Sequence, residues 1–317
     1  MCGICGFTGY RQDQKTVIER MMKAIEHRGP DSEGSFCREK ITLGFRRLSI
    51  IDLEDGQQPM ESADGNLHIV FNGEIYDYKE LRAELEAFGI SFCTHSDTEV
   101  LINTIQQYGE KALDKLRGMF GFAVWNEKEQ TLMLARDFFG IKPVYYAEID
   151  GHFVFASEIK SILAFPGYER KVNQKALEQY LSFQYAPLEE TFFKGIYKLM
   201  PGHMLLYKNG NYEIKTYFKT KLTPGKWNSK TNMDQLRSQL AEILRDSVKH
   251  HMLSDVEVGA FLSGGVDSGY LASASGADQA FTVGFDEGDR YSEVNKAAKV
   301  AEKAGLKHHV KIISKQE

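Results

Sequence analysis

The sequence has little of what marks several classes of protein. Four cysteines in 317 residues are too few for a disulfide-stapled secreted domain, so we expect a reduced, cytoplasmic protein. No apolar run approaches the ~18 residues of a membrane span, and no basic stretch followed by an apolar one opens the chain as a secretory signal would. The 39 basic and 44 acidic residues are interspersed rather than blocked. We therefore expect neither a nucleic acid nor a membrane surface as a partner.

The apolar content and the length instead predict two folded domains. In the first, helical spacing of apolar residues predicts helices over 16–26 and 78–88, and a third that begins at Ser96-Asp97. Apolar runs joined by short polar turns predict neighbouring strands, at 67–72, 119–126, 131–137 and 152–156. This grouping favours antiparallel sheet in an α+β layered domain.

A polar segment over 219–232, which contains Pro224-Gly225, predicts the boundary between domains of residues 2–215 and 233–317. A long amphipathic helix is expected at 233–253. After it, strands and helices alternate, with strands at 256–262, 280–285 and 307–313 and helices near 269–275 and 292–305. This alternation predicts a parallel α/β sheet.

The stretch LSGGVDS, residues 262–268, lies between the first predicted strand and helix of that second domain. Its adjacent glycines allow close approach to a ligand, and a helix that begins there presents free N–H groups, an arrangement suited to phosphate. The Gly-Lys-Ser/Thr end of a kinase-type P-loop is missing. The alternative is a tight turn that binds nothing.

The chain opens with MCGICGF, so that Cys2 and Cys5 are three residues apart. A zinc site would need further ligands, and no second pair is present; a thioredoxin-type redox site would follow a strand. The third possibility is that the initiator Met1 is removed before the small Cys2. The freed α-amine, with a pKa of roughly 7.7–8.0, could then act as base for its own thiol. Cys5 falls in the probable first strand and is expected to pack as a small apolar residue.

With these features in place, the sequence resembles the class II glutamine amidotransferases, which are N-terminal-nucleophile hydrolases, and within them the glutamine-hydrolysing asparagine synthetase family. The stretches that carry the resemblance follow the opening CGICG in order: HRGPDS (27–32), RRLSIID (46–52), FNGEIYDY (71–78), HSDTEV (95–100), RDFFGIKPVYY (136–146), FASEIKSI (155–162) and LSGGVDS (262–268). The resemblance implies an αββα sandwich followed by an incomplete, Rossmann-like parallel α/β domain.

The resemblance also implies which residues of the first domain act. Cys2 would attack the side-chain amide of glutamine, with Asn72 and the Gly73 N–H stabilising the oxyanion. The glutamine-binding residues would be Arg47, Leu48, Ile50, Ile51, Asn72, Gly73, Glu74 and Asp97. Taken alone, Arg47 could be a surface residue beside Arg46, Asn72-Gly73 a hairpin turn, and Asp97 only a helix N-cap. His27, Arg28 and Asp31 fit either a loop that closes over glutamine or a structural turn.

In the second domain the resemblance implies an ATP site. ATP and Mg²⁺ would bind as a substrate complex, with no permanent cofactor and no protein metal site, and aspartate would be the acceptor. The implied nucleotide-binding residues are Leu262, Ser263, Gly264, Gly265, Asp267, Ser268 and Val283. Frequent dimerisation in the family suggests a homodimer.

The sequence departs from the family in its extent. Family members continue past the last residue here and carry a second loop, Ser-Gly-Glu-Gly-x-Asp-Glu, which is missing, so we expect a fragment or a natural truncation with one apolar face of its sheet exposed. Glutamine hydrolysis without asparagine synthesis is expected of such a chain. Two alternatives remain: a relative that amidates another carboxylate, and a non-catalytic domain that senses glutamine or nucleotide.

Overall fold

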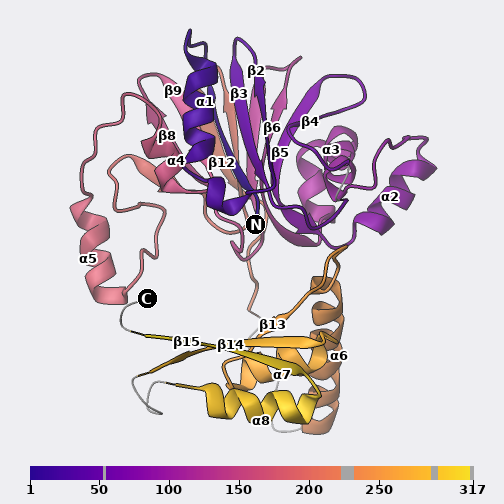
Figure 1. The fold of residues 1–317 in the computed structure, drawn as a ribbon. Coiled ribbons are helices and arrows are strands. Elements are labelled where there is room, and N and C mark those ends of the chain that lie inside the picture. Colours follow the sequence, from indigo (N-terminus) through magenta and orange to yellow (C-terminus); the bar gives the residue numbers. More distant parts are fainter. Residues whose placement is uncertain (53–54, 223–231, 287–291, 315–317) are drawn as a thin grey trace. The chain divides into compact units, whose positions relative to one another are not determined.

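The computed structural model describes residues 1–52, 55–222, 232–286 and 292–314, and the chain forms two units, Met1–Lys221 and Leu222–Glu317 (Figure 1). The predicted boundary segment, 219–232, spans the division between the units. Its residues 223–231, with Pro224-Gly225, lie outside the described residues. Within the described ranges, no helix combines the length and the hydropathy needed to cross a membrane.

The first unit is built on two antiparallel sheets, as the sequence predicted. In spatial order, the strands of one sheet are β10 (Ile196–Lys198), β8 (Tyr145–Ile149), β9 (His152–Ala156), β1 (Gly3–Thr8), β3 (Ile41–Arg47) and β2 (Ser32–Cys37). Those of the other are β12 (Asn211–Thr216), β11 (His203–Lys208), β7 (Thr131–Arg136), β6 (Gly118–Asn126), β5 (Leu67–Ile75) and β4 (Met60–Glu61). Adjacent strands in both sheets run antiparallel.

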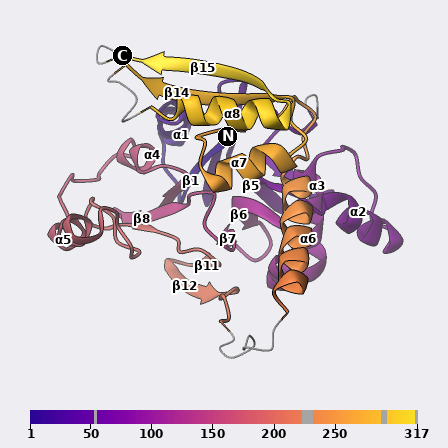
Figure 2. The same cartoon turned by 90° about the horizontal axis from the view of Figure 1, so that it is seen from below.

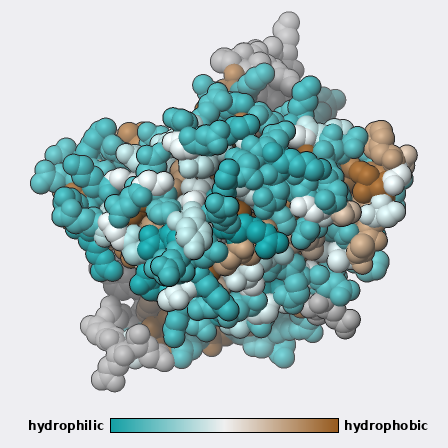
Figure 3. All heavy atoms as spheres, turned by 90° about the horizontal axis from the view of Figure 1, so that it is seen from above, coloured by the Kyte–Doolittle hydropathy of each residue, from teal (hydrophilic) through white to brown (hydrophobic). Residues whose placement is uncertain are grey.

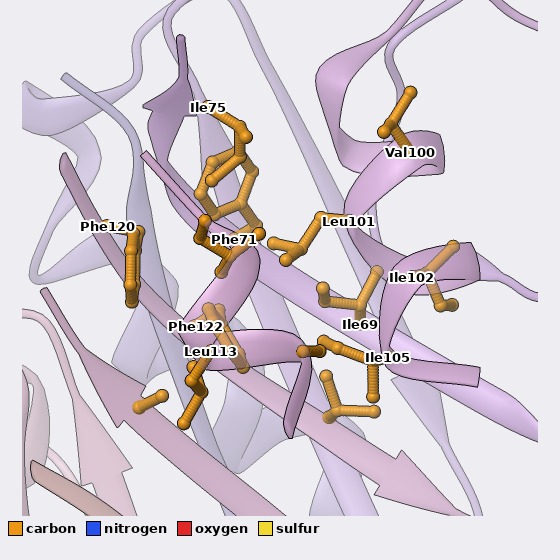
Figure 4. Close-up of a cluster of buried hydrophobic side chains, with 14 of the residues drawn as sticks. Ile69, Phe71, Ile75, Val100, Leu101, Ile102, Ile105, Leu113, Phe120 and Phe122 are labelled. Carbon is orange, nitrogen blue, oxygen red and sulfur yellow. The ribbon is translucent and has the colours of Figure 1, made fainter. Parts of the chain in front are cut away.

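Three buried clusters stack the helices and sheets in four layers. The helices and 3-10 segments of this unit are α1 (Gln14–Lys23), η1 (Glu26–Arg28), α2 (Tyr78–Ala87), α3 (Asp97–Tyr108), η2 (Gly109–Lys115), α4 (Ile159–Leu163) and α5 (Gln174–Phe183). One cluster joins α1 and α4 to the β1 sheet, one lies between the sheets, and one joins the β5 sheet to α2, α3 and η2 (Figure 4). The layer order is αββα, which confirms the fold expected for this domain.

Successive side chains of β1 point to opposite faces of its sheet and pack in two different buried clusters. Ile4 points into the cluster between the sheets, whereas Cys5 and Phe7 point into the cluster with α1. Cys5 is fully buried, and burial raises the pKa of its thiol to about 12. Cys5 therefore packs as a small apolar residue, as expected, and β1 leads Cys2 to the edge of the layer between the sheets.

Some element limits differ from the predicted ones. The helix expected over 16–26 ends at Lys23, and the 3-10 segment η1 continues the chain. Strands β2, β3, β4, β8, β10, β11 and β12 were not predicted. Several of them carry glycine, serine or charged residues instead of a plain apolar alternation, for example SEGSFC in β2.

The second unit is a parallel α/β layer, as predicted. Its elements are α6 (Met233–His251), β13 (Ala260–Phe261), α7 (Val266–Ala274), β14 (Gln279–Phe285), α8 (Val294–Ala304) and β15 (Lys307–Ile313). The strand order is β13-β14-β15, and both pairings are parallel. The strand expected over 256–262 contains only two residues, because the preceding 256–259 stretch makes no ladder contacts.

Among the described residues of this unit, helices cover one face of the sheet and leave the other face bare. Helices α7 and α8 pack on the same face through a cluster of small residues that includes Ala280, Ala297 and Ala301 (Figure 1, Figure 2). Four apolar side chains point to the other face and are 40–85% exposed: Phe261, Phe281, Val283 and Phe285. The exposed apolar face expected from the sequence is therefore present, in contrast to the largely hydrophilic surface seen in Figure 3.

Candidate functional site

A pocket of the first unit gathers every residue predicted to handle glutamine. It is lined by Met1, Cys2, Phe45, Arg47, Leu48, Ile50, Ile51, Gly56, Gln58, Phe71, Asn72, Gly73, Glu74, Ser96, Asp97, Thr98 and Lys142. Its volume is about 50 Å³, room for a few water molecules, which need about 10–15 Å³ each by this measure. Because Met1 is one of the lining residues, its removal enlarges the pocket.

Cys2 lines this pocket and is held by contacts with backbone groups and an arginine. The Leu48 N–H lies 3.4 Å from its Sγ, and Sγ lies 3.5 Å from the Leu48 carbonyl oxygen. The guanidinium of Arg28 donates to the Cys2 carbonyl oxygen at 2.9 Å. Burial raises the pKa of the Cys2 thiol, and the Leu48 N–H opposes that effect. A base beside the thiol is therefore needed before it can act as a nucleophile near neutral pH.

Asn72 and Gly73 line the same pocket from strand β5. Both lie inside strand β5, so the alternative of a hairpin turn is wrong. Asn72 is 1% exposed, and its side-chain Nδ2 has no hydrogen-bond partner within the described parts of the chain. A Cβ on Gly73 would come within 2.2 Å of the Met119 carbonyl oxygen, so glycine is required there. A buried donor without a partner is costly and indicates a ligand acceptor.

Arg47 lines the pocket and contacts the backbone of the segment that follows it. It is 4% exposed, so the alternative of a surface arginine is wrong. Its Nη2 donates to the backbone carbonyls of Ile51 and Asp52, which orients the planar head. A Cβ on Gly56 would lie 2.6 Å from Nη2, so this glycine leaves the space that the guanidinium occupies.

Asp97 is buried at the start of α3. Ser96 is the N-cap, because its side chain accepts the Thr98 N–H, so the interpretation of Asp97 as only an N-cap is wrong. The Asp97 carboxylate instead accepts the Ile75 N–H at 3.0 Å. Burial raises the pKa of Asp97 to about 7, and it also raises the pKa of nearby Glu74. Both carboxyls are therefore poised to gain from a cationic ligand.

The HRGPDS segment (27–32) makes hydrogen bonds and ion pairs with segments next to the pocket. Arg28 and His27 each lie 2.9 Å from a Glu158 carboxylate oxygen, and Asp31 accepts the Ser49 N–H at 2.8 Å. A Cβ on Gly29 would fall 2.3 Å from the backbone of Arg46. These contacts favour the structural-turn interpretation of the segment over a closing loop.

Several lining residues were not found from the sequence. Gln58 links strand β5 to helix α3. Its Oε1 accepts the Phe71 N–H at 2.6 Å, and its Nε2 donates to the Thr98 hydroxyl at 3.1 Å. Lys142 brings a buried ammonium from a loop some 140 residues after Cys2. No local pattern marks either residue, since each acts across the fold. For Lys142, its place in the RDFFGIKPVYY stretch was the available signal.

In the second unit, the LSGGVDS loop connects β13 to α7. The helix begins at Val266, earlier than the predicted 269, so Asp267 and Ser268 lie in its first turn. Gly264 has a φ of +77°, and a Cβ there would lie 2.7 Å from Lys296. Gly264 therefore permits both the turn and close packing of α8.

The hydroxyls of this loop lie together at the helix N-terminus. Ser263 Oγ and Ser268 Oγ are 2.8 Å apart, and the Gly265 N–H donates to Ser263 Oγ at 3.4 Å. Leu262 is buried, and its carbonyl oxygen accepts from Thr282 at 2.6 Å. Val283 lies one residue further along β14 and is 46% exposed on the bare face. The loop thus places polar donors beside an exposed apolar surface.

Comparison with known proteins places this chain in a family. The family model described as "Glutamine amidotransferase domain" matches residues 1–218, so the chain belongs to that family. The model described as "Asparagine synthase" matches residues 239–317. The expected family is thereby confirmed.

Named relatives match along nearly all of this chain. "Asparagine synthetase [glutamine-hydrolyzing] 1" of Bacillus subtilis is 43% identical over 99% of the chain and 51% of its own length. "Amidase chry2" of Gibberella zeae is 33% identical over 98% of the chain and 50% of its own length. The chain thus spans about half the length of these curated relatives.

The fold also matches a solved structure. Glutamine phosphoribosylpyrophosphate amidotransferase from Bacillus subtilis aligns with a TM-score of 0.52 and 19% identity, over 98% of this chain and 65% of that one. At this identity the match bears on the fold alone.

Proposed function

We propose that this chain hydrolyses the side-chain amide of glutamine with Cys2 as the nucleophile, and that the ammonia serves ATP-dependent amidation of aspartate to asparagine, a second step that we do not expect this chain to complete by itself. The observation that carries the proposal is the unpartnered Nδ2 of buried Asn72 in the same pocket as the Cys2 thiol. A nucleophile facing an unused donor is the arrangement that acyl transfer needs.

The chemistry begins once Met1 is removed. The α-amine of Cys2 takes the thiol proton, and the thiolate attacks the amide carbon of glutamine. Asn72 Nδ2 and the Gly73 N–H stabilise the oxyanion. The ammonium returns its proton to the departing nitrogen, so that ammonia leaves and a γ-glutamyl thioester remains. Water attacks the thioester, releasing glutamate and restoring the thiol.

Recognition of glutamine uses the charged walls. The α-carboxylate pairs with the planar head of Arg47, which suits bidentate contact. The α-ammonium is met by Asp97 and Glu74, whose raised pKa values show how strongly each carboxyl would gain from a cation. Leu48, Ile50 and Ile51 shape the wall between them.

The second unit would bind ATP with Mg²⁺ as a substrate complex. The Ser263, Gly265 and Ser268 groups suit a pyrophosphate at the start of α7, and Asp267 suits a Mg²⁺ on its oxygens. Leu262 and Val283 offer apolar contacts for the adenine.

The test is glutamate release from glutamine by the purified chain, with removal of Met1 verified by intact mass. We expect Cys2→Ala to abolish release, because no other group replaces the thiolate. Cys93→Ala is the matched control, since Cys93 is an exposed thiol outside the pocket lining, and it should release glutamate like the wild type. A folded wild-type chain with Met1 removed and no glutamate release would refute the proposal and favour a sensing domain.

A further inference from the structure

The loop after β7 is locked into one shape and points Lys142 at the pocket. The Asp137 carboxylate is 1% exposed and accepts the N–H groups of Phe139, Ile141 and Lys142 at 3.1, 2.9 and 2.8 Å. The Arg136 guanidinium donates to the Lys142 carbonyl oxygen at 2.9 Å. The backbone of Lys142 is therefore fixed at both its N–H and its carbonyl.

The positive charge of the Lys142 ammonium is buried and has no close negative partner among the described residues. Lys142 is 4% exposed, and its Nζ lies 3.1 Å from the Sδ of Met1, a weak acceptor. Among the described residues, no carboxylate oxygen comes within ion-pair distance of Nζ. A buried charge without a close partner is expensive, and its presence at a pocket indicates a role in the chemistry.

The charged groups around Lys142 come from several elements. Glu74 faces it from β5, Arg28 from η1, Asp137 from its own loop, and Cys2 from the start of the chain. Burial lowers the pKa of the Lys142 ammonium, and Glu74 opposes that effect.

The amino terminus shares these surroundings. The α-amine of Met1 faces Cys2 and Asp31 as well as the cations Lys142 and Arg28. Burial lowers the pKa of this amine, and Lys142 and Arg28 lower it further. Asp97 and Arg47 act on the thiol from the other walls.

We propose that Lys142 is a positioning residue for amide hydrolysis: its fixed ammonium beside Cys2 disfavours protonation of the freed α-amine and favours the thiolate. This inference rests on the proposed function. Removal of Met1 takes away the thioether contact of Nζ, so that the ammonium then faces the Cys2 amine and thiol, with the carboxyls of Glu74 and Asp137 to offset its charge. Lys142 thus lowers the pH at which the amine can serve as base.

The experiment measures the pH dependence of two properties of the Met1-processed full chain. One is glutamate release; the other is the rate at which iodoacetamide alkylates Cys2, followed by peptide mass, which needs no turnover. The variants are Lys142→Met and Lys142→Gln, both neutral, and Lys142→Arg, which retains the charge. Lys198→Met is the matched control, because Lys198 is a half-buried lysine outside the pocket lining.

We expect the midpoints of both pH profiles to move up by roughly 0.5–1 pH unit in the neutral variants, since a nearby cation of this kind shifts a pKa by about that much or more. Below the midpoint both rates should fall about 3–10-fold. Lys142→Arg and Lys198→Met should follow the wild type. Superimposed profiles in a folded neutral variant overturn the inference. If the wild type alkylates but releases no glutamate, the proposed function fails while the alkylation profiles still decide the role of Lys142.

Discussion

At the scale of single residues, the pocket contains buried ionisable groups that lower the stability of the ligand-free protein. Asp97 is 5% exposed and carries a pKa raised to about 7 by burial, whereas an unfolded aspartate ionises near 3.9. Its protonated form is thus favoured by folding. The stability that this group contributes is fully present below about pH 4 and is lost as the pH rises through about 7.

Asp97→Asn should therefore stabilise the ligand-free chain at alkaline pH. We expect a gain of roughly 2–4 kcal/mol at pH 8 that disappears near pH 4, because the amide keeps an acceptor for the Ile75 N–H without the buried charge. Urea unfolding at several pH values measures this difference. Glutamine should stabilise the wild type and not the variant.

The matched control for that experiment is Asp64→Asn. The Ser62 hydroxyl lowers the pKa of Asp64, so this substitution should have the opposite sign and a small size. A gain in Asp97→Asn that is equal at pH 4 and pH 8 would contradict the burial argument.

At the scale of elements, the loop that ends at Lys142 depends on one carboxylate. The Asp137 oxygens accept four backbone N–H groups, since Phe120 of β6 donates at 3.2 Å in addition to the three loop donors. Asp137→Asn should lower the free energy of unfolding by about 2–4 kcal/mol, because an NH₂ group would face two N–H donors. Denaturant titration measures the loss.

Asp77→Asn provides the comparison, since Asp77 accepts the Arg117 N–H at 3.0 Å before α2. We expect a cost below about 1 kcal/mol for that single bond. Equal costs at the two positions would show that the loop does not depend on Asp137.

The same scale shows what the sequence could and could not predict. Helix α1 was predicted because Val17, Ile18, Met21 and Met22 repeat at helical spacing and all are buried. Strand β2 was missed because SEGSFC pairs at a sheet edge, where polar side chains are tolerated and no apolar alternation is needed. Pairing of strands depends on partners elsewhere in the chain, so it leaves little local trace.

The candidate site divides in a similar way. Cys2, Asn72 and Asp97 were predicted because their motifs occur in the order that the family resemblance requires. Gln58 and Lys142 were missed because their roles come from contacts that only the fold creates. Sequence reasoning therefore predicted the proposed chemical groups better than the residues that would hold and tune them.

At the scale of the whole molecule, the bare face of the β13–β15 sheet dominates the expected behaviour in solution. Its exposed apolar side chains, Phe261, Phe281, Val283 and Phe285, form a patch of the kind that promotes association. Phe281→Lys with Phe285→Lys should reduce binding of a hydrophobic dye and self-association, without changing glutamate release. Dye fluorescence and sedimentation measure the two effects.

Glu302→Lys on the covered side, in α8, controls for the added positive charge, because Glu302 is an exposed helical residue. It should leave dye binding unchanged. An equal decrease in both variants would mean that charge, and not the apolar patch, governs association.

The place of β1 inside its sheet has a consequence for biosynthesis. Its partner β3 follows within about forty residues, but β9 on its other side pairs Cys5 with Ala156, 151 residues later. At about 5–20 residues per second, that partner emerges roughly 8–30 s after β1. During this interval one edge of β1 is unpaired and Met1 is accessible. An aminopeptidase at the ribosome thus has its best opportunity to expose Cys2 before the sheet closes around the strand.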